Sequence, residues 1–238
     1  MTAPVVLQLS PYPDWDQGPM DAQFDMRRLH EAADPQAFLA EHGPQIRAIA
    51  TRGGRGAEAA IIDACPRLEL IAVYGVGYDA VDLAACRARG IQVTNTPDVL
   101  TGDVADLGVA MMLTQSRGML GAESWVRTGT WTRQGGYPLQ RRVFGRKAGI
   151  LGLGRIGYEV GKRLAGFDMD IAYCDVGPKR YAPDWMFFDD PVALARHSDF
   201  LFVTLSASAQ TRHIVGRDVI NAVGPEGMII NILSLIHI

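Results

Sequence analysis

The sequence has little of what marks a secreted, membrane-embedded or nucleic-acid-binding protein. It contains only 3 cysteines, Cys65, Cys86 and Cys174, and their spacing fits no metal-ligand motif. Its apolar runs fall well short of the roughly 18 residues that a membrane-spanning helix needs. Residues 1–9 carry no basic segment of a signal peptide. With 23 basic and 26 acidic side chains, the net charge of −3 favours neither nucleic acid nor an anionic membrane as a partner.

The same composition indicates a folded protein of the cell interior. Few, unpaired cysteines are typical of free thiols in a reducing compartment, so we expect a cytoplasmic protein with buried structural cysteines. Hydrophobic residues make up 48% of the chain and charged residues 21%, which is enough apolar surface for a real core. The length suggests one large domain or two ordinary ones.

The first part of the chain alternates apolar runs with helical patterns. This order favours a parallel sheet of the α/β class. Ser10–Pro19 is rich in proline and aspartate and predicts a loop. The predicted strands are Val5–Leu9, Ile46–Ala50, Leu68–Val73 and Ile91–Thr94, and the predicted helices are Ala57–Ala64 and Ala84–Arg89.

A longer helix is predicted for Thr101–Arg117. It is apolar on most faces after its first turn, which indicates a buried helix. We expect it to cross between two domains and to place Met111 and Met112 in a core. Residues 122–146 contain several glycines and predict a connection that follows the surface.

The most informative stretch is Lys147–Asp175. An apolar run leads into GLGRIG at 152–157, a helical pattern follows, and a second apolar run ends at Asp175. Strand, glycine turn, helix, strand and acid form the dinucleotide-binding βαβ unit, in which the acid lies about 20 residues after the first glycine. These surroundings predict a dinucleotide site, where the glycine motif alone would be weak evidence.

Each glycine of the motif is explained by the space or the backbone conformation that its position requires. Gly152 allows the tight turn, Gly154 lets the backbone approach a pyrophosphate, and Gly157 lets helix and strand pack closely. The N–H groups of the first helical turn, around Arg155 and Ile156, carry the positive end of the helix dipole and face an anion.

Asp175 predicts the choice of cofactor. Its carboxylate can accept hydrogen bonds from both ribose hydroxyls of NAD and would repel a 2′-phosphate, so NAD is expected in preference to NADP. Lys179 and Arg180 follow closely. They either restore phosphate binding or are solvated charges.

The third predicted strand ends in a second glycine turn, Tyr74–Asp79. Ligands of open α/β sheets bind beyond the carboxyl ends of strands. Gly75 and Gly77 leave backbone N–H groups bare, which suits a carboxylate. A plain tight turn would use the same residues, so this pattern alone does not distinguish a carboxylate-binding turn from a structural one.

Four stretches resemble the D-isomer-specific 2-hydroxyacid dehydrogenase family. They are YGVGYDAVDL at 74–83, VTNTPDVLTGDVADLGVAMML at 93–113, GILGLGRIG at 149–157 and SDFLFVTLSASAQTRHIVG at 198–216, with MIIN at 228–231 as a short fifth. They keep the family's order. The TNTP…DVAD stretch makes the resemblance specific, because GLGRIG alone would not name a family.

The resemblance implies a fold and a reaction. The family has two doubly wound α/β domains with parallel sheets, and its active site lies in the cleft between them. Residues 1–97 would begin the flavodoxin-like substrate domain, and residues 98–238 would form an incomplete Rossmann cofactor domain. The family transfers a hydride from NAD(P)H to a 2-keto acid and gives the D-hydroxy acid. Members are usually dimers through the cofactor domain, which implies a homodimer for a full-length chain.

The resemblance also implies a role for each matching residue. The backbone N–H groups of Val76 and Gly77 would hold the substrate carboxylate. Ser206 stands where a proline is common in the family. No metal site is implied. The cofactor would contact Thr101 and Val104 near the nicotinamide, Gly152, Gly154, Arg155, Ile156 and Gly157 at the pyrophosphate, Asp175 at the adenosine ribose, and Leu205, Ser206 and Thr211 on the other side.

The catalytic residues of the family have no counterpart at the corresponding positions of this sequence. The family uses an arginine that polarises the keto group, a histidine as general acid and a glutamate that raises the pKa of that histidine. The arginine position corresponds to Ser234, and the other two would follow Ile238. We therefore expect a truncated, inactive family member in which residues 233–238 are not the native continuation. His237 lies in that tail and is not expected to be the catalytic histidine.

Two other functions stay open at this point. A co-repressor branch of the family uses the same fold as an NAD-sensing module that recruits partners. The acidic balance and the lack of a peptide-docking signature count against that branch. The third possibility is a different Rossmann enzyme, such as an amino-acid dehydrogenase. An arginine, a glutamate and a histidine in the family's order beyond Ile232 would support the dehydrogenase.

Overall fold

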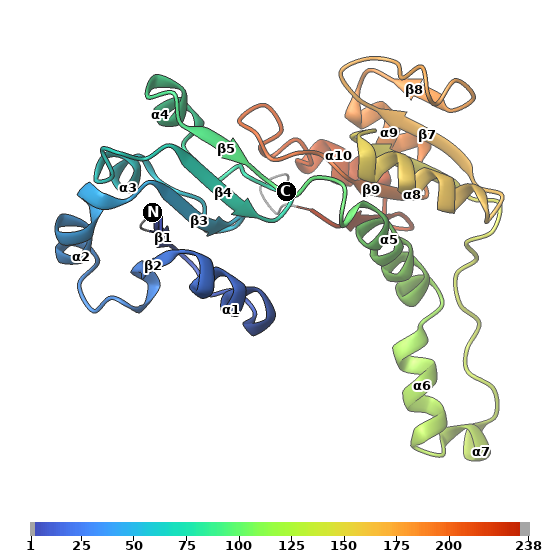
Figure 1. Cartoon of the computed structure of the whole chain (residues 1–238). Helices are drawn as coiled ribbons and strands as arrows, with labels where there is room; N and C mark the ends of the chain where they lie inside the picture. Colours follow the sequence, from blue (N-terminus) through green and yellow to red (C-terminus); the bar gives the residue numbers. More distant parts are fainter. Residues whose placement is uncertain (1–2, 234–238) are drawn as a thin grey trace. The chain divides into compact units, whose positions relative to one another are not determined.

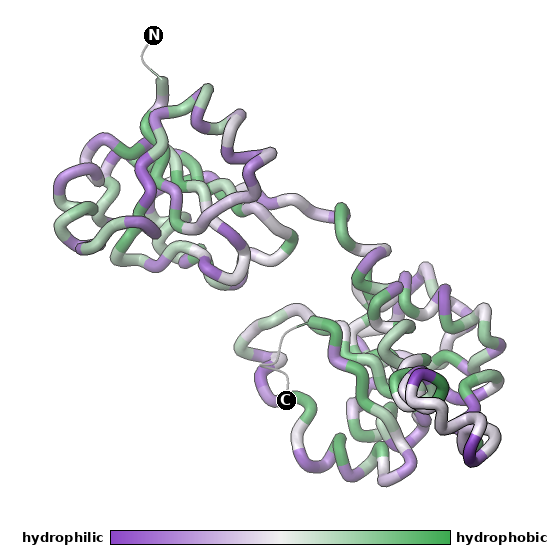
Figure 2. The backbone as a smooth tube through the Cα atoms, turned by 90° about the horizontal axis from the view of Figure 1, so that it is seen from below, coloured by the Kyte–Doolittle hydropathy of each residue, from purple (hydrophilic) through white to green (hydrophobic). Residues whose placement is uncertain are grey.

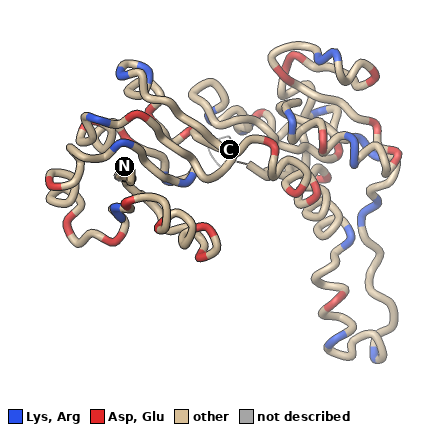
Figure 3. Tube along the Cα trace, viewed as in Figure 1, with Lys and Arg blue, Asp and Glu red and all other residues tan. Residues whose placement is uncertain are grey.

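The computed structural model describes residues 3–233, and the chain divides into two compact units, Met1–Val99 and Leu100–Ile238 (Figure 1). The resemblance placed the domain boundary after residue 97. Each unit contains one parallel sheet of five strands. Apolar segments follow these strands, and Lys, Arg, Asp and Glu are spread over both units without a large region of one sign (Figures 2 and 3).

The first unit has the flavodoxin-like strand order. The chain order is β1, β2, β3, β4 and β5, whereas the order in the sheet is β2-β1-β3-β4-β5, and every neighbouring pair is parallel. The strands are β1 Val5–Gln8, β2 Asp25–Arg28, β3 Ala48–Arg52, β4 Leu70–Tyr74 and β5 Gln92–Thr94. The helices are α1 Asp14–Gln23, α2 Pro35–His42, α3 Ala59–Asp63 and α4 Leu83–Ala88, with short 3₁₀ turns η1 Leu29–Glu31 and η2 Gly43–Gln45.

The central strands of this unit carry its core. Leu7, Ile49 and Ile71 occupy β1, β3 and β4 and are fully buried, and Ile62 of α3 packs into the same cluster. Parallel strands covered on both faces need such apolar residues, because neither face meets water.

Two segments of the first unit differ from the sequence prediction. Ser10–Pro19 was expected to be a loop, yet α1 begins at Asp14 and includes Pro19. The carbonyl of Pro13 accepts the amides of Asp16 and Gln17, and acidic residues in the first turn suit the helix dipole. β2 was missed because its sequence, DMRR, has no apolar run and forms a half-buried edge strand.

The second unit has the Rossmann strand order. The sheet order is β10-β9-β6-β7-β8. Read from β8 with β6 counted as the first strand, this order is 3-2-1-4-5, and the reversal lies between β6 and β9. The strands are β6 Lys147–Leu151, β7 Asp170–Cys174, β8 Met186–Phe188, β9 Phe200–Val203 and β10 Met228–Asn231. The helices are α5 Thr101–Ser116, α6 Met119–Arg127, α7 Thr130–Gln134, α8 Arg155–Ala165, α9 Pro191–His197 and α10 Arg217–Val223.

Two helical layers cover this sheet, and β9 shows both. Phe200 and Phe202 point into the cluster that contains α5 and α8, whereas Leu201 and Val203 point into the cluster that contains α9 and α10. All four side chains are fully buried. The period of two along a strand therefore produces a core on each face.

Helix α5 is less buried than the sequence predicted. Met112 is fully buried in the core, as expected, but Met111 is 43% exposed and Leu107 is 56% exposed. Both line an apolar groove of about 400 Å³ against Met228 and Ile230 of the edge strand β10. The prediction for Met111 was wrong because a helix packed on one side exposes its other face even where that face is apolar.

Residues 122–146 were predicted to be a connection that follows the surface, and in the structure they include the end of α6 and the whole of α7. These helices form an arm that extends away from the sheet of their own unit (Figure 1). Neither helix buries a residue. Across residues 3–233, no helix combines the length and the apolar character needed to cross a bilayer.

Candidate functional site

The glycine turn between β6 and α8 contains two glycines that cannot carry a side chain and a third that could. Gly152 has φ +97°, and a Cβ there would lie 3.0 Å from the backbone nitrogen of Leu205. A Cβ on Gly157 would lie 2.3 Å from the carbonyl oxygen of Gly152. Gly154 differs, because no atom lies within 4 Å of the place where its Cβ would stand. Protein packing therefore requires Gly152 and Gly157, whereas Gly154 leaves open space above the backbone.

The ends of the two neighbouring strands, β7 and β9, hold this turn in place. Gly152 donates its amide to the carbonyl of Cys174 over 2.8 Å, which ties the turn to β7. On the other side, the Thr204 hydroxyl donates to the carbonyl of Gly152 over 2.6 Å, and the Thr204 amide donates to Leu151 over 2.9 Å. The turn thus lies between β7 and β9, at the reversal of strand order where open α/β sheets bind ligands.

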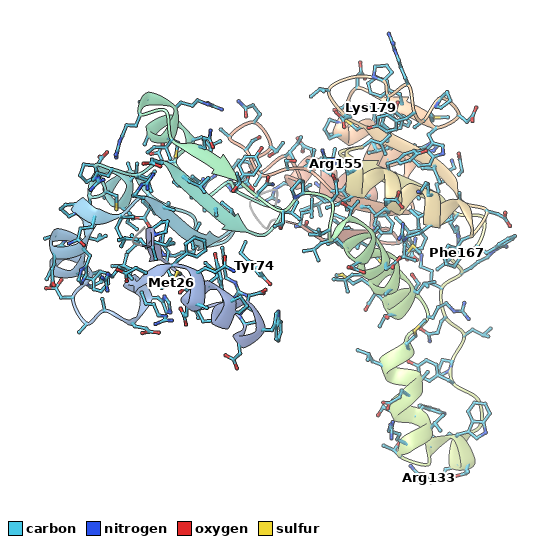
Figure 4. The ribbon with its side chains drawn as sticks, in the orientation of Figure 1. Met26, Tyr74, Arg133, Arg155, Phe167 and Lys179 are labelled. Atoms are coloured by element: carbon cyan, nitrogen blue, oxygen red, sulfur yellow. The ribbon has the colours of Figure 1, made fainter. Side chains whose placement is uncertain are left out.

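Helix α8 begins directly after the turn and presents its first amides there. Gly154 is the N-cap and supplies no side-chain acceptor to those N–H groups. Arg155, the first helical residue, is exposed and labelled in Figure 4, whereas Ile156 packs partly against the core. Amides of the first turn and the positive end of the helix dipole make this position suitable for a phosphate anion.

Asp175 follows β7 and is paired with a lysine. Its Oδ1 accepts the Val176 amide over 2.7 Å and lies 2.8 Å from the Lys179 ammonium. The hydrogen bond to Asp175 is the main cause of a raised pKa of Lys179. The loop is tied back to the glycine turn, because the Tyr181 hydroxyl donates to the carbonyl of Leu153.

The loop after β9 lies on the other side of the turn. Leu205 lies close to Gly152, since a Cβ on Gly152 would lie 3.0 Å from the Leu205 Cα. The Thr211 hydroxyl organises the rest of the loop: it donates to the Ser206 carbonyl over 2.8 Å and accepts the Ser208 amide over 3.0 Å. Of the three positions expected on this side, Leu205 lies against the glycine turn, and Ser206 and Thr211 are joined by a hydrogen bond.

The first turn of α5 is fastened to α8. The Arg163 side chain donates to the Gly102 carbonyl over 3.4 Å and forms an ion pair with Asp106, while also pairing with Glu159 of its own helix. Thr101 and Val104, both half-buried, belong to this turn. The hydrogen bond to Asp106 is the main cause of a raised pKa of Arg163.

In the first unit, the carbonyl groups of the turn after β4 accept hydrogen bonds from the residues that follow β5. The Asn95 amide group donates to the Val76 carbonyl over 2.8 Å, and the Thr96 amide donates to the Gly75 carbonyl over 3.0 Å. Within residues 3–233, the amides of Val76 and Gly77 donate to no protein acceptor. These two N–H groups are thus left for water or a ligand.

Neighbouring strand ends of the same unit are linked beside this turn. Tyr74 closes β4, and its hydroxyl donates to Asp16 of α1 over 2.8 Å (Figure 4). The Arg52 guanidinium at the end of β3 lies 5.8 Å from the Tyr74 ring centroid. Gly53 abuts the turn itself, because a Cβ there would lie 2.4 Å from the Gly77 carbonyl oxygen.

Sequence reasoning missed several residues that hold these loops. Thr204 was passed over although it directly precedes Leu205 at a strand end, the place where such a hydroxyl meets the neighbouring turn. Tyr181 and Arg163 carry no local signal for these roles, since Leu153 lies 28 positions from Tyr181, and Asp106 and Gly102 lie 57 and 61 positions from Arg163.

Comparison with known proteins agrees with this geometry. The family model described as D-isomer specific 2-hydroxyacid dehydrogenase, NAD binding domain, matches residues 109–232. A hydroxyphenylpyruvate reductase of Plectranthus scutellarioides is 38% identical over 232 residues, which cover 98% of this chain and 74% of that protein.

Solved structures match both sheets. A 2-hydroxyacid dehydrogenase from Ketogulonicigenium vulgare is 72% identical with a TM-score of 0.92, covering 97% of this chain and 73% of that one. An NADPH-dependent glyoxylate/hydroxypyruvate reductase from Sinorhizobium meliloti, solved with NADP and malonate, is 36% identical with a TM-score of 0.87, covering 97% of this chain and 71% of that one. The chain therefore belongs to the D-isomer specific 2-hydroxyacid dehydrogenases, oxidoreductases that transfer a hydride between a nicotinamide dinucleotide and a 2-keto or 2-hydroxy acid.

Proposed function

We propose that the second unit binds NAD(H) in preference to NADP(H) and that the first unit binds a small 2-keto acid of the glyoxylate or hydroxypyruvate class. The observation that carries the cofactor site is the open space over Gly154, between β7 and β9, in a turn that is otherwise tightly packed. A Cβ at Gly154 would stand in that space, which is where a pyrophosphate approaches the backbone in a dinucleotide-binding turn.

The residue roles follow the geometry of the turn. Gly152, Gly154 and Gly157 shape the backbone, and the amides at Arg155 and Ile156 bind the pyrophosphate. Asp175 accepts the ribose hydroxyls and disfavours a 2′-phosphate by charge repulsion. Thr101 and Val104 line the nicotinamide side, with Leu205, Ser206 and Thr211 opposite.

The substrate contacts come from the first unit. The amides of Val76 and Gly77 donate to the carboxylate, and this role is supported by the absence of an acceptor for them among residues 3–233. Bound NADH supplies the hydride. None of the described residues is assigned as the general acid or the keto-polarising group; the corresponding arginine position, Ser234, and His237 both lie outside the described residues.

Two experiments test this proposal. Titration of residues 1–238 with NADH, followed by nicotinamide fluorescence, is expected to show saturable binding. A chimera in which residues 233–238 are replaced by the C-terminal part of the Ketogulonicigenium vulgare enzyme is expected to oxidise NADH with glyoxylate or hydroxypyruvate. Residues 1–238 alone are expected to bind NADH without turnover, because they lack an electrophile and an acid. A chimera that binds NADH but reduces neither acid would argue against the assigned substrate class.

We propose further that the protein is a cytoplasmic homodimer that pairs through its second unit. The arm formed by α6 and α7 supports this, because Leu120, Val126 and Trp131 are 77%, 60% and 54% exposed. The free, buried cysteines support a reducing compartment. Light scattering of the chimera and of a Leu120→Glu, Val126→Glu variant tests the dimer, which the variant is expected to dissociate.

A further inference from the structure

The carboxylate of Asp175 is already partly engaged before any cofactor binds. Oδ1 accepts the Val176 amide over 2.7 Å and lies 2.8 Å from the Lys179 ammonium. Oδ2 accepts no hydrogen bond from residues 3–233. A carboxylate oxygen has two lone pairs, so Oδ1 has no further site for a ribose hydroxyl. A ribose can therefore use Oδ2 freely, but it must displace Lys179 or the Val176 amide to engage both oxygens.

The lysine is held at this place by its own backbone. The Lys179 amide donates to the Tyr173 hydroxyl over 2.8 Å, and the Lys179 carbonyl accepts the Ala182 amide over 3.1 Å. Ala182 is buried, and the neighbouring Tyr181 is bonded to the glycine turn. The side chain of Lys179 is only 23% exposed, against 15% for Asp175. This ammonium is thus positioned by the fold rather than free in solvent. Figure 4 labels Lys179 in the second unit.

The pair changes what a 2′-phosphate would meet. An unpaired aspartate repels this dianion, but here an ammonium at contact distance cancels most of that repulsion. Lys179 has three N–H donors and uses one on Asp175, so two remain for phosphate oxygens. Lysine is a suitable phosphate ligand as a point charge.

We propose that Lys179 admits the 2′-phosphate, so that the protein binds NADPH as well as NADH, and that the Asp175–Lys179 pair sets the ratio of the two affinities. This inference rests on the proposed cofactor site in the second unit. It makes Asp175 alone an insufficient guide to cofactor choice in this chain. The proposed preference for NADH stands, but Lys179 limits its size.

The test compares ligands that differ only in the phosphate. Residues 1–238 are titrated with NADH and NADPH by fluorescence, and with 5′-AMP and adenosine 2′,5′-bisphosphate by thermal shift. The wild type is expected to bind NADPH within about tenfold of NADH, and Lys179→Met is expected to weaken NADPH about tenfold or more while leaving NADH unchanged or tighter. Lys179→Arg is expected to retain NADPH binding. Asp175→Asn is expected to strengthen NADPH binding relative to NADH.

Lys162→Met is the matched control, because it removes another lysine that is paired with an acid, Glu159, on α8. It is expected to leave both affinities unchanged. The inference is overturned if wild type binds NADH but not NADPH, or if Lys179→Met weakens both cofactors equally. Failure of the wild type to bind either cofactor overturns the proposed cofactor site itself, and the two failures are therefore distinguishable.

Discussion

The hydroxyl of Thr204 at the end of β9 donates a 2.6 Å hydrogen bond to the carbonyl oxygen of Gly152 at the end of β6. Both residues are buried, and Thr204 is only 6% exposed. The bond spans the reversal of strand order in the Rossmann sheet. A side chain of one strand thereby fixes the shape of the turn that follows its neighbour, and the proposed pyrophosphate site depends on both.

Replacing Thr204 by valine is expected to destabilise the second unit and weaken NADH binding. The buried Gly152 carbonyl would lose this partner, a loss that costs about 1–3 kcal/mol. Thr204→Ser keeps the hydroxyl and serves as the control in urea unfolding and NADH titration. Equal stability of the valine and serine variants would show that the hydroxyl contributes nothing.

The first and last residues of Gly154–Gly157 are expected to respond differently to the same change. Gly157→Ala should destabilise the fold by about 1–3 kcal/mol, because its Cβ meets the Gly152 carbonyl and the Thr204 hydroxyl. Gly154→Ala should fold normally, since its Cβ meets nothing, but should bind NADH much more weakly. Thermal unfolding and NADH titration of both variants separate packing from ligand contact. Normal NADH affinity in folded Gly154→Ala would contradict the proposed pyrophosphate site.

Gly77→Val is expected to raise the KM for glyoxylate in the chimera without changing NADH affinity. A branched side chain beside the amide would obstruct the approach of the carboxylate, whereas the cofactor is bound by the other unit. Steady-state kinetics and NADH titration measure the two effects. Gly54→Val is a control in the same unit, because a Cβ at Gly54 meets nothing within 4 Å. An unchanged KM in Gly77→Val would argue against a carboxylate at this turn.

The buried cysteines are expected to make the protein less stable at high pH. Burial raises the pKa of Cys65 and of Cys174 to about 11, above the ordinary thiol value near 8.5. Because the folded state holds these protons more tightly, their contribution is fully present below about pH 8.5 and is lost as the pH rises towards 11. Urea unfolding across this range should show a shallower decline in a Cys65→Ala, Cys174→Ala variant. Thiol reagents at pH 8 should modify wild type only upon unfolding, and rapid labelling of folded protein would contradict this.

The adjacent methionines of α5 are expected to differ in their effect on solubility. The edge strand β10 and the exposed Leu107 and Met111 form an apolar groove, so residues 1–238 should associate as concentration rises. Met111→Lys should reduce association with little change in stability. Met112→Lys should unfold the second unit, because Met112 is fully buried and a lysine there would lack a partner. Light scattering and thermal unfolding measure both, and unchanged association of Met111→Lys would exclude the groove as the cause.

Local sequence patterns were sufficient to predict the elements that depend on residues close together in the chain. Most of the apolar strands, the glycine turn at Gly152–Gly157 and the acid at Asp175 were predicted, because turn glycines and buried parallel strands leave signals within a few residues. The short strands β2 and β8 were not predicted. The resemblance added the family and the two doubly wound sheets, which the comparisons and the strand orders confirm.

Only the tertiary structure decided which face of an element is buried and which distant side chains meet. The sequence could not separate Met111 from Met112, since their burial depends on which face of α5 packs against the sheet. It could not pair Thr204 with Gly152, because that contact follows from the order of strands in the sheet rather than from the order in the chain. It left Lys179 either as a phosphate ligand or as a solvated charge, whereas the fold places its ammonium 2.8 Å from Asp175. The sequence determined which hydrogen-bonding and charged groups are present, and three-dimensional packing determined which of them lie close enough to interact.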